Sequence, residues 1–294
     1  MKEQNGISFR DAIVELIRRS STDIGSEWEA ALKKAAQKEE TGTGAHVALE
    51  AIIENIRLAR ESSAPICQDT GVLNFFVDYP AGGFEAGYIN VINEAVEEAT
   101  KKQYLRPNAV DSLTGKNSEN NLGQNAPIFT FHQWEEDYTR IRVLQKGGGC
   151  ENCSIQYRLP DTTLGAGRDL KGVRKVVIDA ALKAQGFGCA PGIFGIAIGG
   201  DRTQSYKLAK EQLFRKAGER AANPELAELE LSLLKDINTL EVGPMGFGGK
   251  TTALEVFIAA QHRHPATYYV SIAYSCWAYR NATLILKGGK ARYD

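Results

Sequence analysis

Glycine marks the places where apolar segments of this chain end. The chain has 29 glycines, which gather at residues 147–149, 186 and 188, 199–200, and 246–249. Short apolar or β-branched runs adjoin these groups, as is typical where a strand meets a loop. Glycine at such ends permits positive φ angles and lets backbone N–H groups approach an anion. The pattern therefore predicts strands that end in glycine-lined loops.

Between these loops the hydrophobic spacing alternates between helix and strand. The proline-free segment from Phe9 to Ser62 predicts two or three surface helices. Further helices are predicted at 84–102, at 173–180 with Gly186 as a left-handed cap, and after the N-cap pair Asn223-Pro224. Strands are predicted at 72–79, 139–144, 193–198, 254–259 and 268–273. We therefore expect an α/β mixed (α+β) fold, with an N-terminal helical segment followed by a mixed sheet flanked by helices.

Length and charge limit the organisation and the partners. A chain of 294 residues with 43% hydrophobic content can bury a large core and is near the upper size of one domain. We expect a helical segment at 1–62 and a main domain at 63–294, or one continuous domain at 1–294. Lys and Arg total 35 against 36 Asp and Glu, so no overall field favours nucleic acid or an anionic membrane. Without an apolar run of ~20 residues, we expect a cytoplasmic protein.

The cysteine pattern indicates metal chemistry. Five cysteines, an odd number, argue against a disulfide framework. In the run Cys67-Gln68-Asp69, a soft metal ligand, a hydrogen-bonding amide and a proton-transfer group lie together. Cys150 and Cys153 form a C-x-x-C motif, but it follows three glycines and does not open a helix as a thioredoxin-type pair would. No second such motif or His pair follows at a zinc-finger distance, so the role of this pair stays open.

Two phosphate-binding motifs are incomplete. The stretch from Gly243 to Thr251 resembles a P-loop, but five residues separate its glycines and the predicted strand follows it. Gly186-Phe-Gly188 lacks the third glycine of a dinucleotide fingerprint, because Pro191 holds that position. We therefore expect no nucleotide site.

Six segments occur together and in a fixed order along the chain. They are Ile66–Gly71, Leu105–Asn108, Lys146–Gly149, Cys189–Pro191 with Ile198–Gly200, Gly246–Lys250, and His264-Pro265 followed by Cys276-Trp277-Ala278. In these segments the chain resembles the class I fumarase family of iron–sulfur hydro-lyases. The likeness is to its α subunit or N-terminal region, which includes the α subunit of L-tartrate dehydratase, and it covers residues 67–280.

The resemblance implies a [4Fe-4S] cluster held by Cys67, Cys189 and Cys276. Electron-transfer clusters use four thiolates, so three would leave one iron with an open site for Lewis-acid chemistry. Cys150 and Cys153 flank the glycine-rich loop, and either is an alternative ligand.

The resemblance also assigns roles in substrate binding and proton transfer. It implies substrate contacts from Gln68, Arg106, Gly148 and Gly149, and catalytic roles for Asp69 and His264. Guanidinium geometry suits a bidentate grip on a carboxylate, which favours this role for Arg106. An aspartate before Thr-Gly also commonly caps a turn, so that interpretation of Asp69 stays open.

The implied reaction is the reversible hydration of fumarate to L-malate, with a small dicarboxylate as substrate. The alternatives are an L-tartrate dehydratase α subunit, a mesaconate-type hydratase or, as a non-enzyme, an iron–sulfur or thiol redox sensor. The resemblance implies a partner, either a β subunit or a C-terminal domain of the same enzyme, and a homo-oligomer of α/β pairs. The identity of the catalytic base stays open.

Overall fold

The chain folds into two compact units, each built from separate stretches of sequence. The computed structural model describes residues 3–5 and 7–294. Unit 1 comprises Met1–Ile24, Asn55–Gly148 and Arg280–Asp294, and unit 2 comprises Gly25–Glu54 and Gly149–Tyr279. The division at residue 62 stays a prediction, and residues 1, 2 and 6 of that predicted segment lie outside the described residues. No helix in the described part has the length and apolar character to cross a membrane.

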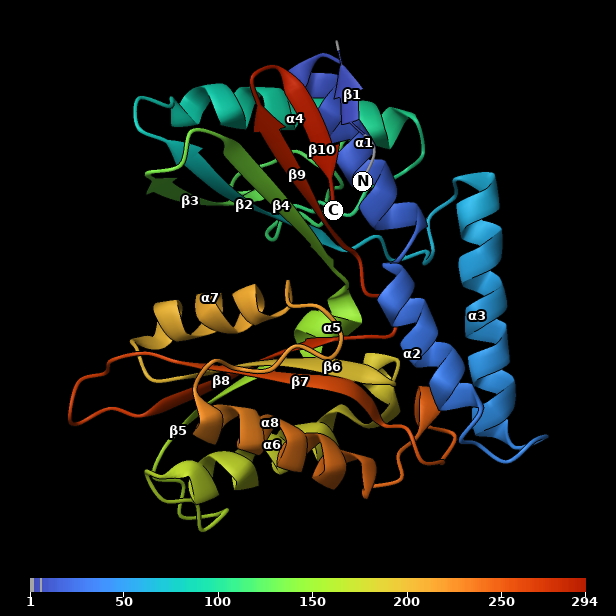
Figure 1. The fold of residues 1–294 in the computed structure, drawn as a ribbon, viewed down its shortest axis with the longest axis vertical. Coiled ribbons are helices and arrows are strands. Elements are labelled where there is room, and N and C mark those ends of the chain that lie inside the picture. Colours follow the sequence, from blue (N-terminus) through green and yellow to red (C-terminus); the bar gives the residue numbers. More distant parts are fainter. Residues whose placement is uncertain (1–2, 6) are drawn as a thin grey trace. The chain divides into compact units, whose positions relative to one another are not determined.

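Unit 1 is built on a six-stranded mixed sheet (Figure 1). Its strands, in spatial order, are β1 (Glu3–Asn5), β10 (Lys290–Tyr293), β9 (Asn281–Lys287), β4 (Thr139–Lys146), β2 (Val72–Pro80) and β3 (Ile128–Trp134). Only β2 and β3 pair in parallel, and the other neighbours are antiparallel. Helices α1 (Phe9–Thr22) and α4 (Glu85–Lys101) cover one face, where their apolar side chains pack against alternate residues of β2 and β4.

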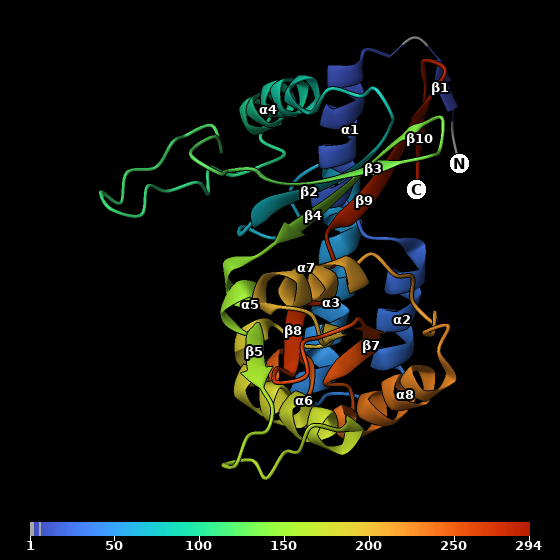
Figure 2. The same cartoon turned by 90° about the vertical axis from the view of Figure 1, so that its left-hand side faces the viewer.

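Unit 2 is a four-stranded mixed sheet with helices on both faces (Figures 1 and 2). The order is β5 (Ile155–Arg158), β8 (Tyr269–Ser275), β6 (Gly192–Ile198) and β7 (Ala253–Ala260), with only β6 and β7 parallel. Helix α7 (Arg202–Gln212) covers one face, and α6 (Leu170–Ala184) and α8 (Pro224–Asn238) cover the other. Every residue of β6 is buried, as a strand covered on both faces requires.

Three further helices and two short 3-10 turns complete the chain. They are α2 (Ser26–Ala36), α3 (Gly44–Ser62), α5 (Gly148–Asn152), η1 (Gln185–Gly188) and η2 (Pro244–Gly246). Within unit 2, α2 packs Trp28 against Phe257 and Tyr279. The carboxylate of Glu39 accepts the backbone N–H groups of Lys250 and Thr251 and so anchors the loop that follows η2.

The predicted α/β mixed class is confirmed, as are three helices before residue 63 and the five predicted strands. The structure differs in three respects. The mixed sheet is in fact two mixed sheets, and α1 is a core element whose Ile13, Leu16 and Ile17 are fully buried. The residue with positive φ that ends α6 is Gln185, at φ +41°, and Gly186, the predicted cap, lies within η1.

Candidate active site

The Cys67–Gly71 segment of unit 1 connects α3 to β2. Gly71 has φ +79°, and a Cβ there would lie 2.7 Å from the carbonyl carbon of Lys146, because β2 enters the sheet opposite the end of β4. Both the positive φ and the close approach therefore require glycine. Upstream of it, Gln68 is exposed, whereas Cys67 and Asp69 are half-buried.

Asp69 joins this segment to the glycine loop that follows β4. Its Oδ1 accepts the N–H of Gly71 at 2.9 Å, and its Oδ2 accepts the N–H of Gly148 at 2.7 Å. A Cβ at Gly147 would lie 2.9 Å from Asp69 Oδ2, so this loop position also has no room for a side chain. The turn-capping role of Asp69 is thus present in the structure. An ionised carboxylate has about four acceptor sites, so two remain for other partners.

Arg280 is a buried cation beside Asp69 that no sequence pattern identified. Arg280 is 2% exposed, and its guanidinium donates to the backbone carbonyl of Asp69. Its Nε–H is buried and has no hydrogen-bond partner among residues 3–5 and 7–294. A buried N–H without a partner costs free energy, so this end of unit 1 favours a further acceptor, such as an anion.

Arg106 is positioned by backbone contacts to the same segment. Thr70, the neighbour of Asp69, accepts the N–H of Arg106 at 3.1 Å, and Asn121 donates to the carbonyl of Arg106 at 2.9 Å. The Arg106 side chain is exposed and lines a cavity of about 820 Å³ that Lys101 also lines. A fixed backbone with an accessible guanidinium suits recognition of a carboxylate.

Unit 2 brings Cys189 and Cys276 together. Cys189 precedes β6 and Cys276 follows β8, and these strands are antiparallel neighbours with Ile193 opposite Ser275. The N–H of Trp277 also donates to the carbonyl of Cys189 at 3.3 Å. Cys67, the third predicted ligand, belongs to unit 1. Within the described residues, no group of three or more His, Cys, Asp or Glu side chains is arranged to hold a metal ion.

A buried tyrosine lies among the cysteines of unit 2. Tyr274 packs so closely against Gly188 and Gly192 that a Cβ on either glycine would lie 2.4 Å from its ring. Its hydroxyl is buried without a hydrogen-bond partner in the described part of the chain. Burial raises the pKa of Tyr274 well above its ordinary value, and the nearby thiols of four cysteines raise it further: Cys276, Cys150, Cys153 and Cys189. Tyr274 therefore stays neutral in a sulfur-rich surrounding.

His264 lies in the 261–268 loop between β7 and β8 and is exposed. Its Nδ1 accepts the N–H of Ala266 at 3.1 Å, so the neutral ring carries its proton on Nε2. The imidazole lines a cavity of about 590 Å³ with His262, Arg202 and Arg263. This cavity belongs to unit 2, whereas Asp69 and Arg106 belong to unit 1.

Comparison with known proteins gives the family. The model of the family described as fumarate hydratase (Fumerase) matches residues 10–285. The chain belongs to the fumarate hydratase family. It is 47% identical over 273 residues to a Geobacillus stearothermophilus protein assigned as a class I fumarate hydratase, covering 92% of this chain and 53% of that protein.

Two further relatives of this family match over most of their own length. A Methanocaldococcus jannaschii protein assigned as an L(+)-tartrate dehydratase alpha subunit is 37% identical over 96% of this chain and 98% of that protein. The L(+)-tartrate dehydratase alpha subunit of Escherichia coli K12 is 32% identical over 86% of this chain and 82% of its own length. The chain thus spans about half the length of the Geobacillus relative and nearly all of the Methanocaldococcus relative.

Membership of the class I fumarate hydratase family implies an iron–sulfur cluster. The residues present fit such a group. Thiolates are the ligands that iron–sulfur clusters use. Unit 2 holds Cys189 and Cys276 on hydrogen-bonded segments next to the buried ring of Tyr274. The four cysteines near Tyr274 include Cys150 and Cys153, for which the family resemblance supplied no role.

Proposed function

We propose that this chain is the α part of an iron–sulfur hydro-lyase that reversibly hydrates fumarate to L-malate. The observation that carries the proposal is the pairing of the Cys189 and Cys276 segments in a chain whose family match covers residues 10–285. Arg106 of unit 1 supports the proposal, because its backbone is fixed by Thr70 and Asn121 while its guanidinium is exposed, and a redox sensor needs no such carboxylate-binding group. Tartrate dehydration is the second candidate, since two of the relatives carry that name.

Cys67, Cys189 and Cys276 would hold the cluster. With three thiolates, the bound group would supply an open iron as a Lewis acid toward the hydroxyl and carboxylate of the substrate. In support of this, the backbone segments that carry Cys189 and Cys276 are hydrogen-bonded to each other, because the N–H of Trp277 donates to the carbonyl of Cys189. Cys67 would complete the set, as the family resemblance implies.

The substrate carboxylates would be bound by Arg106, Gln68 and the glycine loop. Arg106 and Gln68 are both exposed, so their side chains can reach a ligand without leaving a buried partner. The N–H of Gly148 is donated to Asp69 in this structure, so a substrate carboxylate would compete with Asp69 for it. Gly149, also exposed, offers the next N–H along the loop.

Asp69 and His264 would serve proton transfer. Two backbone N–H groups hold the Asp69 carboxylate in one orientation and leave acceptor sites for a substrate proton. His264 lines its cavity, and because its Nδ1 accepts from Ala266, the neutral ring has a proton on Nε2 that it could donate. The remaining groups, including the base, would come from a β subunit or a C-terminal domain, in an oligomer of α/β pairs. The cytoplasmic location also stays a prediction.

The decisive assay mixes the chain, reconstituted without oxygen, with its β partner. Fumarate hydration and L-tartrate dehydration are followed side by side, each with the chain alone as reference. We expect turnover of fumarate with the partner and at most a trace without it. Full fumarase activity from the 294-residue chain by itself would contradict the two-part enzyme, and preference for tartrate would select the second candidate.

A second assay separates the two interpretations of Asp69. Asp69→Asn keeps an acceptor oxygen for one of the two loop N–H groups but cannot take a proton. If Asp69 transfers a proton, kcat falls by at least ~100-fold while KM changes little. If Asp69 only caps the turn, thermal stability falls and kcat of the folded fraction does not.

A further inference from the structure

Cys150 and Cys153 are one helical turn apart at the end of a short helix. Contrary to the expectation from the sequence, Cys150 lies in a helix, α5, and the N–H of Cys153 donates to the carbonyl of Gly149 at 3.1 Å, which continues the turn. Residues three apart on a helix have Cα atoms about 5 Å apart, within the usual disulfide range of roughly 4.4–6.8 Å. The backbone therefore already has the spacing that a disulfide between these residues needs.

The two thiols differ in access. Cys150 is 5% exposed, whereas Cys153 is half-buried and lines a cavity of about 490 Å³. Lys183 and the exposed ring of Phe187 line the same cavity, which belongs wholly to unit 2. An accessible thiol with a buried thiol one turn behind it is the arrangement of an attacking and a resolving cysteine.

The cavity has features that suit a small organic disulfide with carboxylate groups. The Lys183 ammonium offers a positive charge, although it also pairs with Asp179 at 2.6 Å. The Phe187 side chain is 77% exposed and gives the ligand an apolar contact. The volume, about 490 Å³, lies in the usual range for small-molecule sites, roughly 300–1,000 Å³.

The turn that carries the pair is tied to β8, the strand that leads to Cys276. Ser154 donates its hydroxyl to the carbonyl of Cys150 at 2.7 Å and accepts the N–H of Tyr274 at 3.0 Å. The chain also runs directly from Gly148, which binds Asp69, into this turn. A change in the covalent state of the turn therefore acts on segments next to both the glycine loop and Tyr274.

We propose that Cys150 and Cys153 form a reversible disulfide by exchange with a small organic disulfide that enters this cavity. The Cys153 thiolate attacks one sulfur of the reagent, so its S–S bond breaks and one thiolate leaves and takes up the proton that Cys153 lost. The Cys150 thiolate then attacks Cys153 Sγ and releases the second thiol of the reagent. In total the two cysteines are oxidised and the reagent is reduced to two thiols.

The experiment uses the cluster-loaded chain, without oxygen, and glutathione disulfide as the reagent. Peptide mass spectrometry after alkylation should find Cys150 joined to Cys153, with the iron retained, and dithiothreitol should reverse the bond. Cys150→Ser should keep one glutathione on Cys153, and Cys153→Ser should slow modification of residue 150 at least ~10-fold, because that thiol is buried. Cys150→Ala, which keeps an apolar side chain, repeats the trapping test if the serine variant folds poorly.

Cys67 provides the matched control, because it is also half-buried but has no cysteine one turn away. In the chain before it is loaded with the cluster, where Cys67 holds no iron, Cys67→Ser should leave formation of the Cys150–Cys153 bond unchanged. The proposal is overturned if Cys153 reacts no faster than Cys67 in that chain, or if the disulfide in the loaded chain joins Cys153 to Cys189 or Cys276. It is also overturned if replacement of either cysteine of the pair removes iron, since the pair would then bind the cluster.

Discussion

The two compact units differ most in where they place sulfur and buried charge. Unit 1 contains one of the five cysteines, and unit 2 contains the other four. Unit 1 buries Asp78 on the sheet face opposite α1 and α4, where Arg140, Arg142 and His132 all contact its carboxylate. Those partners reach solvent, so the Asp78 charge is shared with a hydrated surface.

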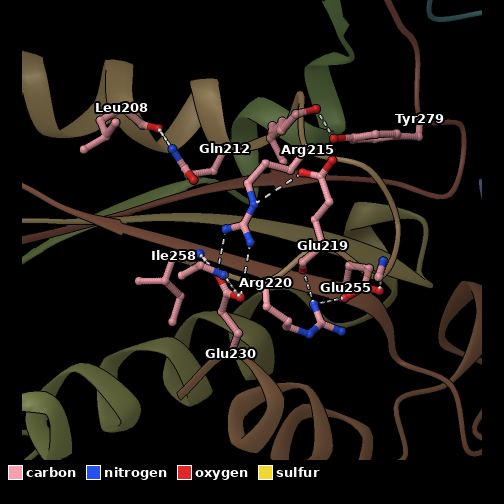
Figure 3. Close-up of polar contacts among 12 residues, drawn as sticks. Leu208, Gln212, Arg215, Glu219, Arg220, Glu230, Glu255, Ile258 and Tyr279 are labelled. Atoms are coloured by element: carbon pink, nitrogen blue, oxygen red, sulfur yellow. Dashed lines mark hydrogen bonds and ion pairs between the residues drawn. The ribbon is translucent and has the colours of Figure 1, made fainter. Parts of the chain in front are cut away.

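Unit 2 instead buries a carboxylate completely. Glu230 is 0% exposed and pairs with Arg215 at 2.6 Å, as Figure 3 shows. The same carboxylate accepts the backbone N–H groups of Ala221 and Ile258 at 3.0 and 2.7 Å, and the Arg215 guanidinium lies 4.6 Å from the centre of the Phe257 ring. One side chain thus connects α8, the 213–223 loop and β7.

The two units therefore suit different roles. Unit 1 has exposed N–H groups that suit a carboxylate ligand, whereas unit 2 has cysteine thiols on a sheet and helices that the buried Glu230–Arg215 ion pair holds together. Because one partner of such a pair cannot be removed without leaving a buried charge, we expect the frame of unit 2 to be the more sensitive to single substitutions.

The largest effect should come from the thiols of unit 2. Cys189→Ser and Cys276→Ser should each abolish cluster binding, because serine is a poor ligand for the soft iron–sulfur core. Iron and sulfide analysis after reconstitution without oxygen measures this, with Cys150→Ser as the control that keeps its cluster. Loss of iron from Cys150→Ser, with Cys189→Ser unaffected, would reverse the ligand assignment.

The buried carboxylate of unit 2 gives the next effect. Glu230→Gln should lower the free energy of unfolding by roughly 3–5 kcal/mol, because the buried Arg215 would lose its close counter-ion and keep only the half-exposed Glu219, 3.9 Å away. Urea unfolding of the full chain measures it. Asp236→Asn is the matched control, because Asp236 pairs with the exposed Arg174 at 2.6 Å, and its loss should cost at most about 1 kcal/mol. Equal effects of the two variants would remove the contrast between buried and exposed pairs in this unit.

Substrate binding by unit 1 gives the third effect. In the complex with the β partner, Arg106→Ala should raise KM for the dicarboxylate by roughly 30–150-fold, or about 2–3 kcal/mol, since one charged hydrogen-bonding group is lost. Lys101→Ala is the control, because Lys101 lines the same cavity but pairs with Glu97 at 2.9 Å. An equal response to both variants would mean that the cavity attracts anions only through its overall charge.

The elements predicted from sequence were those whose burial leaves a clear pattern. Strand β6 is an apolar β-branched run, and α8 begins at Asn223, whose side chain caps the helix as predicted. Helix α7 was missed because only Ser205 and Ala209 are buried on it, which gives almost no apolar periodicity. The Gly288-Gly289 pair is the sequence signal that could have predicted the β9–β10 hairpin. Both glycines have positive φ in the structure, as two-residue hairpin turns require.

The candidate site was predictable only in part, because several of its contacts depend on strand pairing. The run Cys67-Gln68-Asp69 could be identified from its residue types. In contrast, the contact of Arg280 with Asp69 requires β9 to lie beside β4 and β4 beside β2, which no local pattern reveals. The burial of Tyr274 among cysteines likewise follows from the β6–β8 register.

The smallest effect on the free energy of unfolding should come from Glu15 on α1 of unit 1, and it should depend on pH. Glu15 pairs with Arg18 and Arg19 near the surface, so its replacement tests whether unit 1 tolerates the loss of a charge. Burial raises the pKa of Glu15, but hydrogen bonds from Arg18 and Arg19 outweigh it and lower the pKa below 4.5. Since the folded-state pKa lies below the unfolded value, the stabilisation is fully present above pH 4.5 and is lost as the pH falls through the folded pKa. Glu15→Gln should therefore lower the free energy of unfolding by roughly 0.5–1 kcal/mol at neutral pH and by nothing measurable once Glu15 is protonated.

Urea unfolding at several pH values measures the difference, with the exposed Glu61, paired with Arg57, as the control position. A cost that persists at acid pH would show that Glu15 acts through packing and not through its charge.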